Sequence, residues 1–395
     1  MKKSFINSKL PKIGSSIFAV MSKMALDYNA INLSQGFPDF NCPDQLLKLV
    51  EEYQAKGFNQ YAAMPGVPKL REQLSKKIKK LYGRDYNSET EITITAGATQ
   101  AIFTAITASI EKEDEVILLE PAYDSYAPSV LINGGVPVFV PLIKGSYKID
   151  WDRVKDNISD KTKMIILNSP HNPTGSVITE TDIKILEELT RNTGILIISD
   201  EVYEHIIFDG EKHFSLSVSE ELAGRSFIIF SFGKTYHTTG WKLGYCAAPE
   251  NLTKEFRKIH QFVVFSVNTP VQYAYADFLD NEEHYLSLNN FYEKKRDLVT
   301  SLLKDLFYNF NPAKGTYFQL LDYSKISEMN DMDFAERLTK EFGIAVIPLS
   351  PFYSNPYNEK VIRICFAKRD EVLYEGMNRL KKASQILSEK NTIAK

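Results

Sequence analysis

The sequence predicts an α/β protein in which a mostly parallel, doubly wound sheet forms a large domain and a smaller α+β domain follows it. Short, unbroken apolar runs alternate with amphipathic helical patterns from about residue 30 to residue 275. Such runs are typical of parallel strands that helices cover on both faces. Polar side chains follow the ends of these runs, as expected for a ligand site at the carboxyl edge of a parallel sheet.

The large domain is expected to span residues 31–280. Its first half contains two helices, a strand that enters a turn at residues 96–99, a third helix and a second strand, at residues 46–56, 67–81, 91–95, 100–110 and 115–119. Its second half contains a strand that enters a proline-rich turn at residues 168–175, a helix and two further strands, at residues 163–167, 180–191, 194–199 and 227–230.

The smaller domain is expected to span residues 281–395, because the alternation of strand and helix stops near residue 281. A long helical pattern comes first, then a strand, a second helix, two short strands and a final helix. The elements before the final helix cover residues 282–307, 315–321, 332–342, 345–348 and 360–366. Residues 1–30 are expected to pack on this domain as an N-terminal arm.

The composition excludes several function classes. The chain has 395 residues, of which 44% are apolar and 25% charged, the balance of a globular protein that buries a large core. Its 47 basic and 50 acidic residues give a net charge of −3, without the basic excess typical of nucleic-acid binding. The lysine-rich run at residues 76–80 is interpreted as a solvated helix face.

The sequence indicates a cytoplasmic protein. The three cysteines lie far apart and form no pair motif, which suits a reducing compartment. The N-terminal residues lack the apolar stretch of a secretory signal, and no apolar run reaches the ~18 residues that a membrane span needs. We therefore expect no membrane contact.

Several common motifs are absent. Gly233-Lys234-Thr235 resembles the end of a phosphate-binding P-loop, but Ile228 stands where that motif requires its first glycine. No two glycines are separated by one residue, so the dinucleotide fingerprint is missing. Because there is no HExxH, no GxSxG and only six scattered histidines, neither a metal site nor a serine hydrolase is expected.

Asp200 and Lys234 are the strongest candidates for chemistry. Asp200 closes an apolar strand, where a carboxylate needs a cation or several donors. It is either an N-cap of the next segment or the counter-ion of a protonated pyridine ring. Lys234 follows another buried strand; it is either a solvated surface group or a desolvated nucleophile that forms Schiff bases.

Three further features suit the same strand-end crevice. Asn172 lies in a turn that two prolines hold rigid. The segment is either a plain tight turn, or it positions the Asn172 side chain to donate to a phenolate oxygen. The segment at residues 97–100 opens a helix after a strand, a natural but common anion seat to which Ser231 and Lys242 could add donors. Arg363 interrupts an apolar strand, either in a structural salt bridge or to bind a substrate carboxylate.

In order and spacing, these residues resemble the class I aminotransferases of pyridoxal 5′-phosphate (PLP) fold type I over nearly the whole chain. Within that family the chain is most similar to the kynurenine/glutamine transaminase branch and its bacterial methionine aminotransferases. The similarity rests on Gly36-Phe37-Pro38-Asp39-Phe40, Gly315-Thr316-Tyr317-Phe318 and Arg363-Ile364-Cys365-Phe366. The family implies a seven-stranded sheet, PLP as cofactor, and a homodimer that shares its active sites.

The resemblance implies roles for individual residues. Lys234 would form the internal aldimine and move the proton, with Asp200 on the pyridine nitrogen and Tyr203 on the ring oxygen. Arg363, Asn172 and Gly36 would bind the substrate carboxylate, and Asn172 would also bond the ring oxygen. The remaining cofactor contacts would come from Tyr123, which stacks on the ring, and from the phosphate-binding residues Gly97, Ala98, Thr99, Ser231, Lys242 and Tyr61 of the partner subunit. Many relatives have arginine in place of Lys242.

The expected reaction is a ping-pong transamination between a neutral amino acid, methionine-like or aromatic, and a 2-oxo acid. No arginine is evident for a distal carboxylate, and Phe18, Tyr61, Phe265 and Phe352 are candidate apolar walls. A kynurenine/glutamine transaminase with cysteine-S-conjugate β-lyase activity would use the same residues. A non-catalytic protein that merely binds PLP is the third possibility, which the paired Lys234 and Asp200 argue against.

Overall fold

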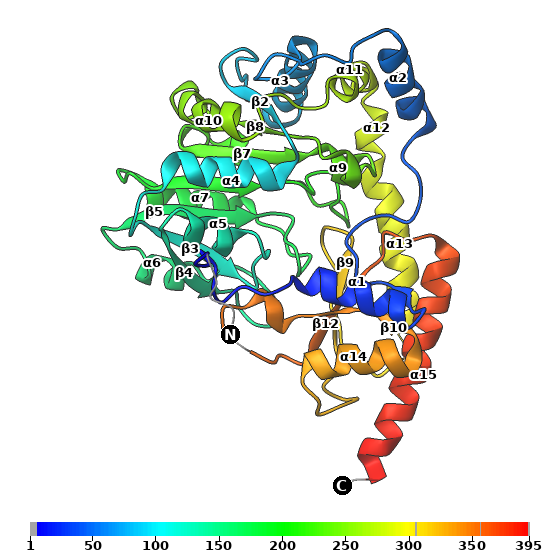
Figure 1. Ribbon diagram of the computed structural model, residues 1–395. Helices are drawn as coiled ribbons and strands as arrows, with labels where there is room; N and C mark the ends of the chain where they lie inside the picture. Colours follow the sequence, from blue (N-terminus) through cyan, green and yellow to red (C-terminus); the bar gives the residue numbers. More distant parts are fainter. Residues whose placement is uncertain (1–5, 305, 356, 394–395) are drawn as a thin grey trace.

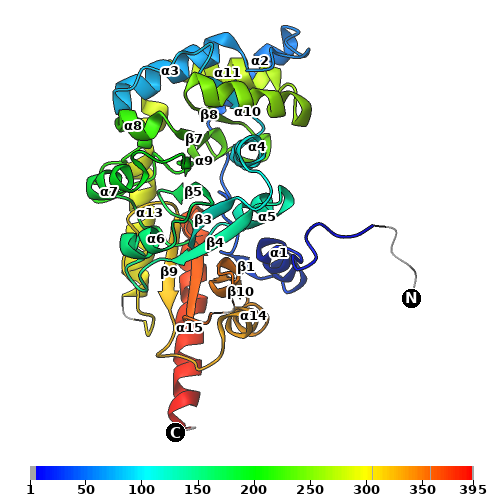
Figure 2. The ribbon, with the colours of Figure 1, turned by 90° about the vertical axis from the view of Figure 1, so that its left-hand side faces the viewer.

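A central sheet with helices on both faces dominates the molecule, and a second group of helices and short strands lies beside its lower end in Figure 1. The computed structural model describes residues 6–304, 306–355 and 357–393. The view in Figure 2 shows the large sheet between helices on either side. This arrangement confirms the predicted α/β class.

The large sheet has seven strands, in the order β2-β8-β7-β6-β5-β3-β4. β8 runs antiparallel to both its neighbours and the remaining pairs are parallel. In spatial order the strands are β2 (Ile92–Thr95), β8 (Gly244–Ala247), β7 (Ser226–Ser231), β6 (Leu196–Asp200), β5 (Thr162–Asn168), β3 (Glu115–Glu120) and β4 (Val136–Pro141). The inner strands are buried along most of their length, because helices cover both faces.

Helices from the first 280 residues surround this sheet. They are α2 (Asp44–Ala55), α3 (Pro68–Tyr82), α4 (Ala98–Ser109), α5 (Tyr126–Ile132), α6 (Trp151–Asp156), α7 (Glu180–Thr190), α8 (Glu220–Ala223), α9 (Phe232–Thr235), α10 (Glu250–Val263) and α11 (Thr269–Phe278). α7 begins with a capping box between Thr179 and Asp182, which satisfies backbone donors at its first turn. In the described part of the chain, no helix has the length and apolarity to cross a membrane.

The other described residues form two small sheets and five further α-helices. The antiparallel sheet joins β11 (Ile347–Pro348), β12 (Val361–Cys365) and β9 (Phe318–Asp322), and the parallel one joins β1 (Ile31–Asn32) to β10 (Ile344–Ala345). α1 (Ile17–Asp27) packs on β10 and β11. The other four helices are α12 (Glu283–Leu286), α13 (Leu288–Leu303), α14 (Asp331–Phe342) and α15 (Asp370–Ile393).

Several predicted elements differ in detail. The helix expected at residues 282–307 is two helices, α12 and α13, which meet at Ser287, where ψ is −8°. The strand expected at 345–348 is split at Val346, where the chain leaves one small sheet for the other. Strands β4 and β8 were not predicted. The lysine run is not wholly solvated, since Lys77 is buried in an ion pair with Glu204.

The parallel strands end together, and this positions the site. Asn168 and Asp200 are register partners at the ends of β5 and β6, and Ser231 ends the adjacent β7. Their side chains therefore meet at one edge of the sheet, as the strand-end polar residues of the sequence predict.

Candidate active site

A cavity of about 150 Å³ lies at this edge of the sheet. Most predicted cofactor residues line it: Gly97, Ala98, Thr99, Tyr123, Asn172, Asp200, Tyr203, Ser231, Lys234 and Lys242. These residues come from six separate stretches of the chain, so the fold brings together what the sequence keeps far apart.

Lys234 points into the cavity from α9, the short helix that follows β7. Burial lowers the pKa of its ammonium to about 8, against an opposing effect of the Asp200 carboxylate. Its Nζ donates to the Gly36 carbonyl at 3.4 Å and lies 5.6 Å from the centroid of the Tyr203 ring. A lysine that loses its proton this readily is suited to act as a nucleophile and as a base.

Asp200 is a buried carboxylate with few donors. Tyr126 donates to its Oδ2 at 2.6 Å, and the backbone N–H of Val202 to its Oδ1 at 3.3 Å. Burial nevertheless raises the pKa of Asp200 to about 6. The N-cap interpretation is wrong, because the residues that follow form a turn and the carboxylate faces the cavity. A cationic ring nitrogen would offset the cost of ionising this group.

Asn172 and Arg363 are joined directly. Arg363 Nη1 donates to Asn172 Oδ1 at 2.7 Å and Nη2 to the Ser34 carbonyl at 3.0 Å, while Nε has no partner. The guanidinium is fully buried, 3.8 Å from the centroid of the Phe318 ring. The structural salt bridge considered from the sequence is not formed with any residue that the structure describes. Arg363 is thus a buried cation without a salt bridge to any described residue, although its charge acts on Asp124 by lowering the pKa of that carboxyl against the effect of burial.

The start of α4 has the geometry expected of an anion seat. Gly97 precedes the helix with φ 79°, a left-handed conformation that glycine adopts without strain. A Cβ atom placed there would lie 3.4 Å from Lys242 Nζ, so the lysine ammonium stands beside the free N–H groups of the helix start. Helix dipole, backbone donors and ammonium together favour a phosphate. The helix begins at Ala98, two residues before the predicted start.

Aromatic side chains frame the cavity. Tyr123 and Tyr203 both line it, and burial raises the pKa of Tyr123 to about 12. Tyr203 packs edge-on to Tyr317 with ring centroids 5.1 Å apart. Tyr317 in turn donates to the Gly36 carbonyl at 2.6 Å. A Cβ at position 36 would lie 2.8 Å from the Phe318 ring, so a larger residue there would have to displace that ring.

Three predicted residues, Tyr61, Gly36 and Arg363, are not part of the cavity lining, and two contributors were missed. Tyr61 is 81% exposed and packs against Phe265 elsewhere on the surface. Gly36 reaches the site through its contact with Lys234 rather than as part of the lining. Tyr126 and Asn168 were not anticipated; the position of Tyr126 three residues after Tyr123, at helical spacing, was the available signal.

The family described as aminotransferase class I and II matches residues 28–380 of the chain. This chain is a class I/II aminotransferase. The predicted family and enzyme class, transfer of nitrogenous groups, are thereby confirmed, and the aminotransferase family implies an amino acid and a 2-oxo acid as substrates.

Relatives resemble this aminotransferase over almost its full length. Methionine aminotransferase of Escherichia coli is 46% identical over 375 residues, which cover 95% of this chain and 97% of that protein. Kynurenine–oxoglutarate transaminase of Dictyostelium discoideum is 35% identical, with 93% of this chain and 94% of that protein covered. A solved Escherichia coli structure identified with a methionine aminotransferase function has a TM-score of 0.94 and 45% identity, covering 96% of this chain and 100% of that one.

Membership in this aminotransferase family implies PLP as the cofactor. The cavity suits that group chemically, because it combines an amine of lowered pKa, a buried carboxylate and a helix start flanked by a lysine. When bound, PLP supplies an aldehyde that reacts with amines and a ring that withdraws electrons from the substrate α-carbon.

Proposed function

We propose that this enzyme transfers the amino group of a neutral L-amino acid, methionine-like or aromatic, to a 2-oxo acid in a ping-pong reaction. One observation carries the proposal: the fully buried guanidinium of Arg363 has a free Nε and no ion-pair partner among the described residues. A buried cation of this kind requires an anion. The planar carboxylate of an amino acid matches the guanidinium fork.

The surroundings of Arg363 favour an apolar substrate side chain. Phe18 and Phe352 lie 5.3 and 5.5 Å from the guanidinium carbon, measured to their ring centroids, and Phe318 lies closer still. The cations that line the cavity are Lys234 and Lys242, and both are assigned to other tasks. The site therefore offers apolar contact to the side chain and no dedicated cation for a second carboxylate. Apolar contact discriminates by only ~1–3 kcal/mol per methylene, so broad specificity is expected.

Lys234 is proposed to be the catalytic base and the covalent anchor of the cofactor. Its depressed pKa leaves a substantial neutral fraction near pH 8, and a base of that pKa is well matched to neutral conditions. Nζ would take the α-proton of the substrate and return it in the same half reaction. The short helix α9 and the contact with Gly36 limit where that atom can go.

The other cavity residues are proposed to orient the cofactor. Asp200 would hold a proton on the ring nitrogen, and Asn172 and Tyr203 would donate to the ring oxygen; Asn172 Nδ2 is available because its Oδ1 accepts from Arg363. Tyr123 would stack on the ring. The phosphate would be held by Gly97, Ala98, Thr99, Ser231 and Lys242.

A homodimer is proposed to complete the site with Tyr61 of the partner subunit. Tyr61 is 81% exposed, Phe262 86% and Phe265 49%, and clustered exposed aromatics are typical of protein contacts. The proposal predicts complementation: Lys234→Ala and Tyr61→Ala chains, each poorly active, should regain activity when unfolded and refolded together. Mixed chains no more active than the separate variants, or a monomer by light scattering, would contradict it.

The direct test of the proposed function is a panel of amino acids assayed for 2-oxo acid formation with the cofactor-loaded enzyme. Methionine and aromatic amino acids should react with higher kcat/KM than aspartate or glutamate. Lys234→Ala should lose at least ~10²-fold in kcat, the usual contribution of a positioned base. Retained activity in that variant, or a preference for acidic donors, would refute the proposal.

A second candidate function is kynurenine or glutamine transamination with β-lyase activity on cysteine S-conjugates. It is favoured by the similarity to kynurenine–oxoglutarate transaminases, at 35% identity for the Dictyostelium protein. Product analysis distinguishes the two: ammonia and pyruvate from a cysteine S-conjugate would indicate elimination, whereas a conjugate-derived 2-oxo acid would indicate transamination.

A further inference from the structure

A second cavity, of about 560 Å³, adjoins the loop that carries Asn172. Asn172 faces the active site, whereas Thr174 and Gly175, at the end of the same loop, line the second cavity. The turn at residues 144–148 and the segment at residues 309–314 form the opposing walls. This volume lies within the range of small-molecule sites, roughly 300–1,000 Å³.

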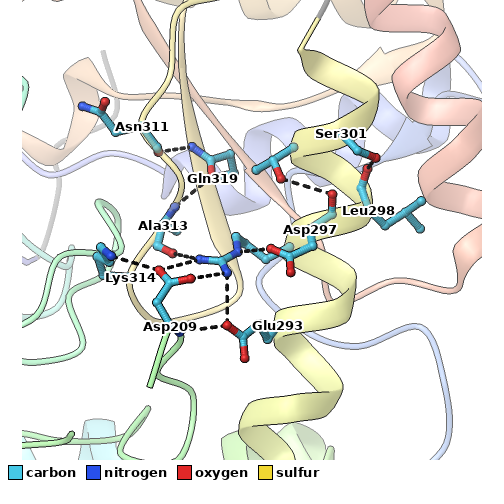
Figure 3. A network of polar contacts seen from close by, with 11 residues as sticks. Asp209, Glu293, Asp297, Leu298, Ser301, Asn311, Ala313, Lys314 and Gln319 are labelled. Atoms are coloured by element: carbon cyan, nitrogen blue, oxygen red, sulfur yellow. Dashed lines mark hydrogen bonds and ion pairs between the residues drawn. The ribbon is translucent and has the colours of Figure 1, made fainter. Parts of the chain in front are cut away.

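The wall at residues 311–314 is held rigidly in place, as Figure 3 shows. Arg296 Nη1 donates to the Ala313 carbonyl at 3.0 Å and Nη2 to Asp209 Oδ1 at 2.7 Å. Gln319 accepts from the Ala313 N–H at 3.0 Å and donates to the Asn311 carbonyl at 2.8 Å. Such satisfied networks favour a cavity that is formed before a ligand arrives.

The chemistry of the cavity indicates an amphipathic anion. Its apolar lining includes Phe214, Phe310, Leu320 and Val361. Of four lysines at its edge, Lys314 pairs with Asp209, whereas Lys144, Lys148 and Lys212 form no ion pair with the residues that the structure describes.

Three carboxylates also line the cavity, and among the described residues none of them forms an ion pair with these lysines. Tyr147 and Tyr353 donate to the buried Glu359 carboxylate. Asp322 Oδ1 accepts from the Ser324 N–H at 2.7 Å. Glu211 is the remaining acid, and it is exposed. Three lysines without a carboxylate partner above an apolar floor complement a ligand with one anionic group and an apolar body.

We propose that this cavity is an effector site for an organic anion with an apolar body. The backbone N–H groups of Lys314 and Gly315 both donate to the Gly175 carbonyl, at 3.1 and 2.9 Å. The wall is thereby bonded to the loop of Asn172, and it continues into Tyr317, which donates to Gly36. A ligand on this wall contacts the elements that hold the substrate carboxylate, so its binding and substrate binding are coupled.

The probe is 1-anilinonaphthalene-8-sulfonate, titrated by fluorescence into the cofactor-loaded enzyme. The test variant is Lys148→Glu with Lys212→Glu. The matched control is Lys155→Glu with Lys161→Glu, two exposed lysines outside the cavity that form no described ion pair. We expect one probe per chain, at least ~10-fold weaker binding in the test variant because two attractions become repulsions, and unchanged affinity in the control.

Kinetics supply the second readout. Saturating probe should change the KM for methionine at least two-fold in the wild type and in the control variant. The same probe should leave the KM of the test variant unchanged. Without probe, the activity of the test variant should stay within two-fold of wild type. Equal binding to the test variant and the control would overturn the site. Binding lost as expected but without any effect on KM would overturn the effector role.

Discussion

Replacing Tyr126 with phenylalanine tests how the fold controls Asp200. The Tyr126 hydroxyl donates to the buried carboxylate at 2.6 Å, and a hydrogen bond to a charged group contributes ~1.5–3 kcal/mol. At ~1.36 kcal/mol per pKa unit, its loss should raise the pKa of Asp200 by ~1–2 units above its value of about 6. The hydroxyl is thus expected to keep Asp200 ionised near neutral pH.

The sign of the pH dependence follows from proton linkage. The pKa of Asp200 is raised from 3.8 to about 6 in the folded protein, so between these values the folded state binds more protons than the unfolded state. The free energy of unfolding therefore falls as the pH rises through this window. The loss levels off above pH 6 at ~3 kcal/mol, because about two pKa units correspond to ~1.36 kcal/mol each. In Tyr126→Phe the same fall should continue to pH ~7–8 and become larger by ~1.5–3 kcal/mol, the contribution of the lost hydrogen bond.

The assay is urea unfolding of the cofactor-free protein between pH 5 and pH 8. The destabilisation of Tyr126→Phe relative to wild type should grow across this range. Tyr275→Phe is the matched control, because that buried hydroxyl bonds Thr238 at 2.6 Å rather than a carboxylate; its destabilisation should not change with pH. An equal, pH-independent loss in both variants would refute the assigned role of Tyr126.

Three further predictions follow from the site and the core. Arg363→Lys keeps the charge but loses the fork geometry, so the KM for the amino donor should rise at least ~10-fold. Cofactor affinity, measured by equilibrium titration, should stay unchanged. A shift in cofactor affinity alone would contradict the substrate role of Arg363. Lys242→Ala should weaken that cofactor affinity at least ~10-fold and Lys242→Arg should restore it, since a cation beside Gly97 is what the phosphate needs. Lys77→Met removes the ammonium that pairs with the buried Glu204 carboxylate and leaves it the Tyr82 hydroxyl as a donor. The variant should lose ~3–5 kcal/mol of stability in urea unfolding, and a stability within ~1 kcal/mol of wild type would contradict this prediction.

The sequence alone determined the fold class because its inner strands are buried on both faces. β3, β5, β6 and β7 are unbroken apolar runs, and such runs are visible without any knowledge of the structure. β4 was missed because this edge strand contains two prolines and an exposed Val136, and β8 because it is four residues long and starts with glycine.

The sequence also determined most cavity residues, because a parallel sheet brings its strand ends to one edge whatever the loops do. Lys234, Asp200 and Asn172 each follow or end a predicted strand and line one cavity. Only the tertiary structure decided which groups satisfy them. Tyr126 reaches Asp200 across 74 positions of sequence, and Arg363 reaches Asn172 across 191. No local pattern encodes such contacts, since packing between distant elements sets them; the same packing leaves Arg363 without a salt bridge to any residue that the structure describes.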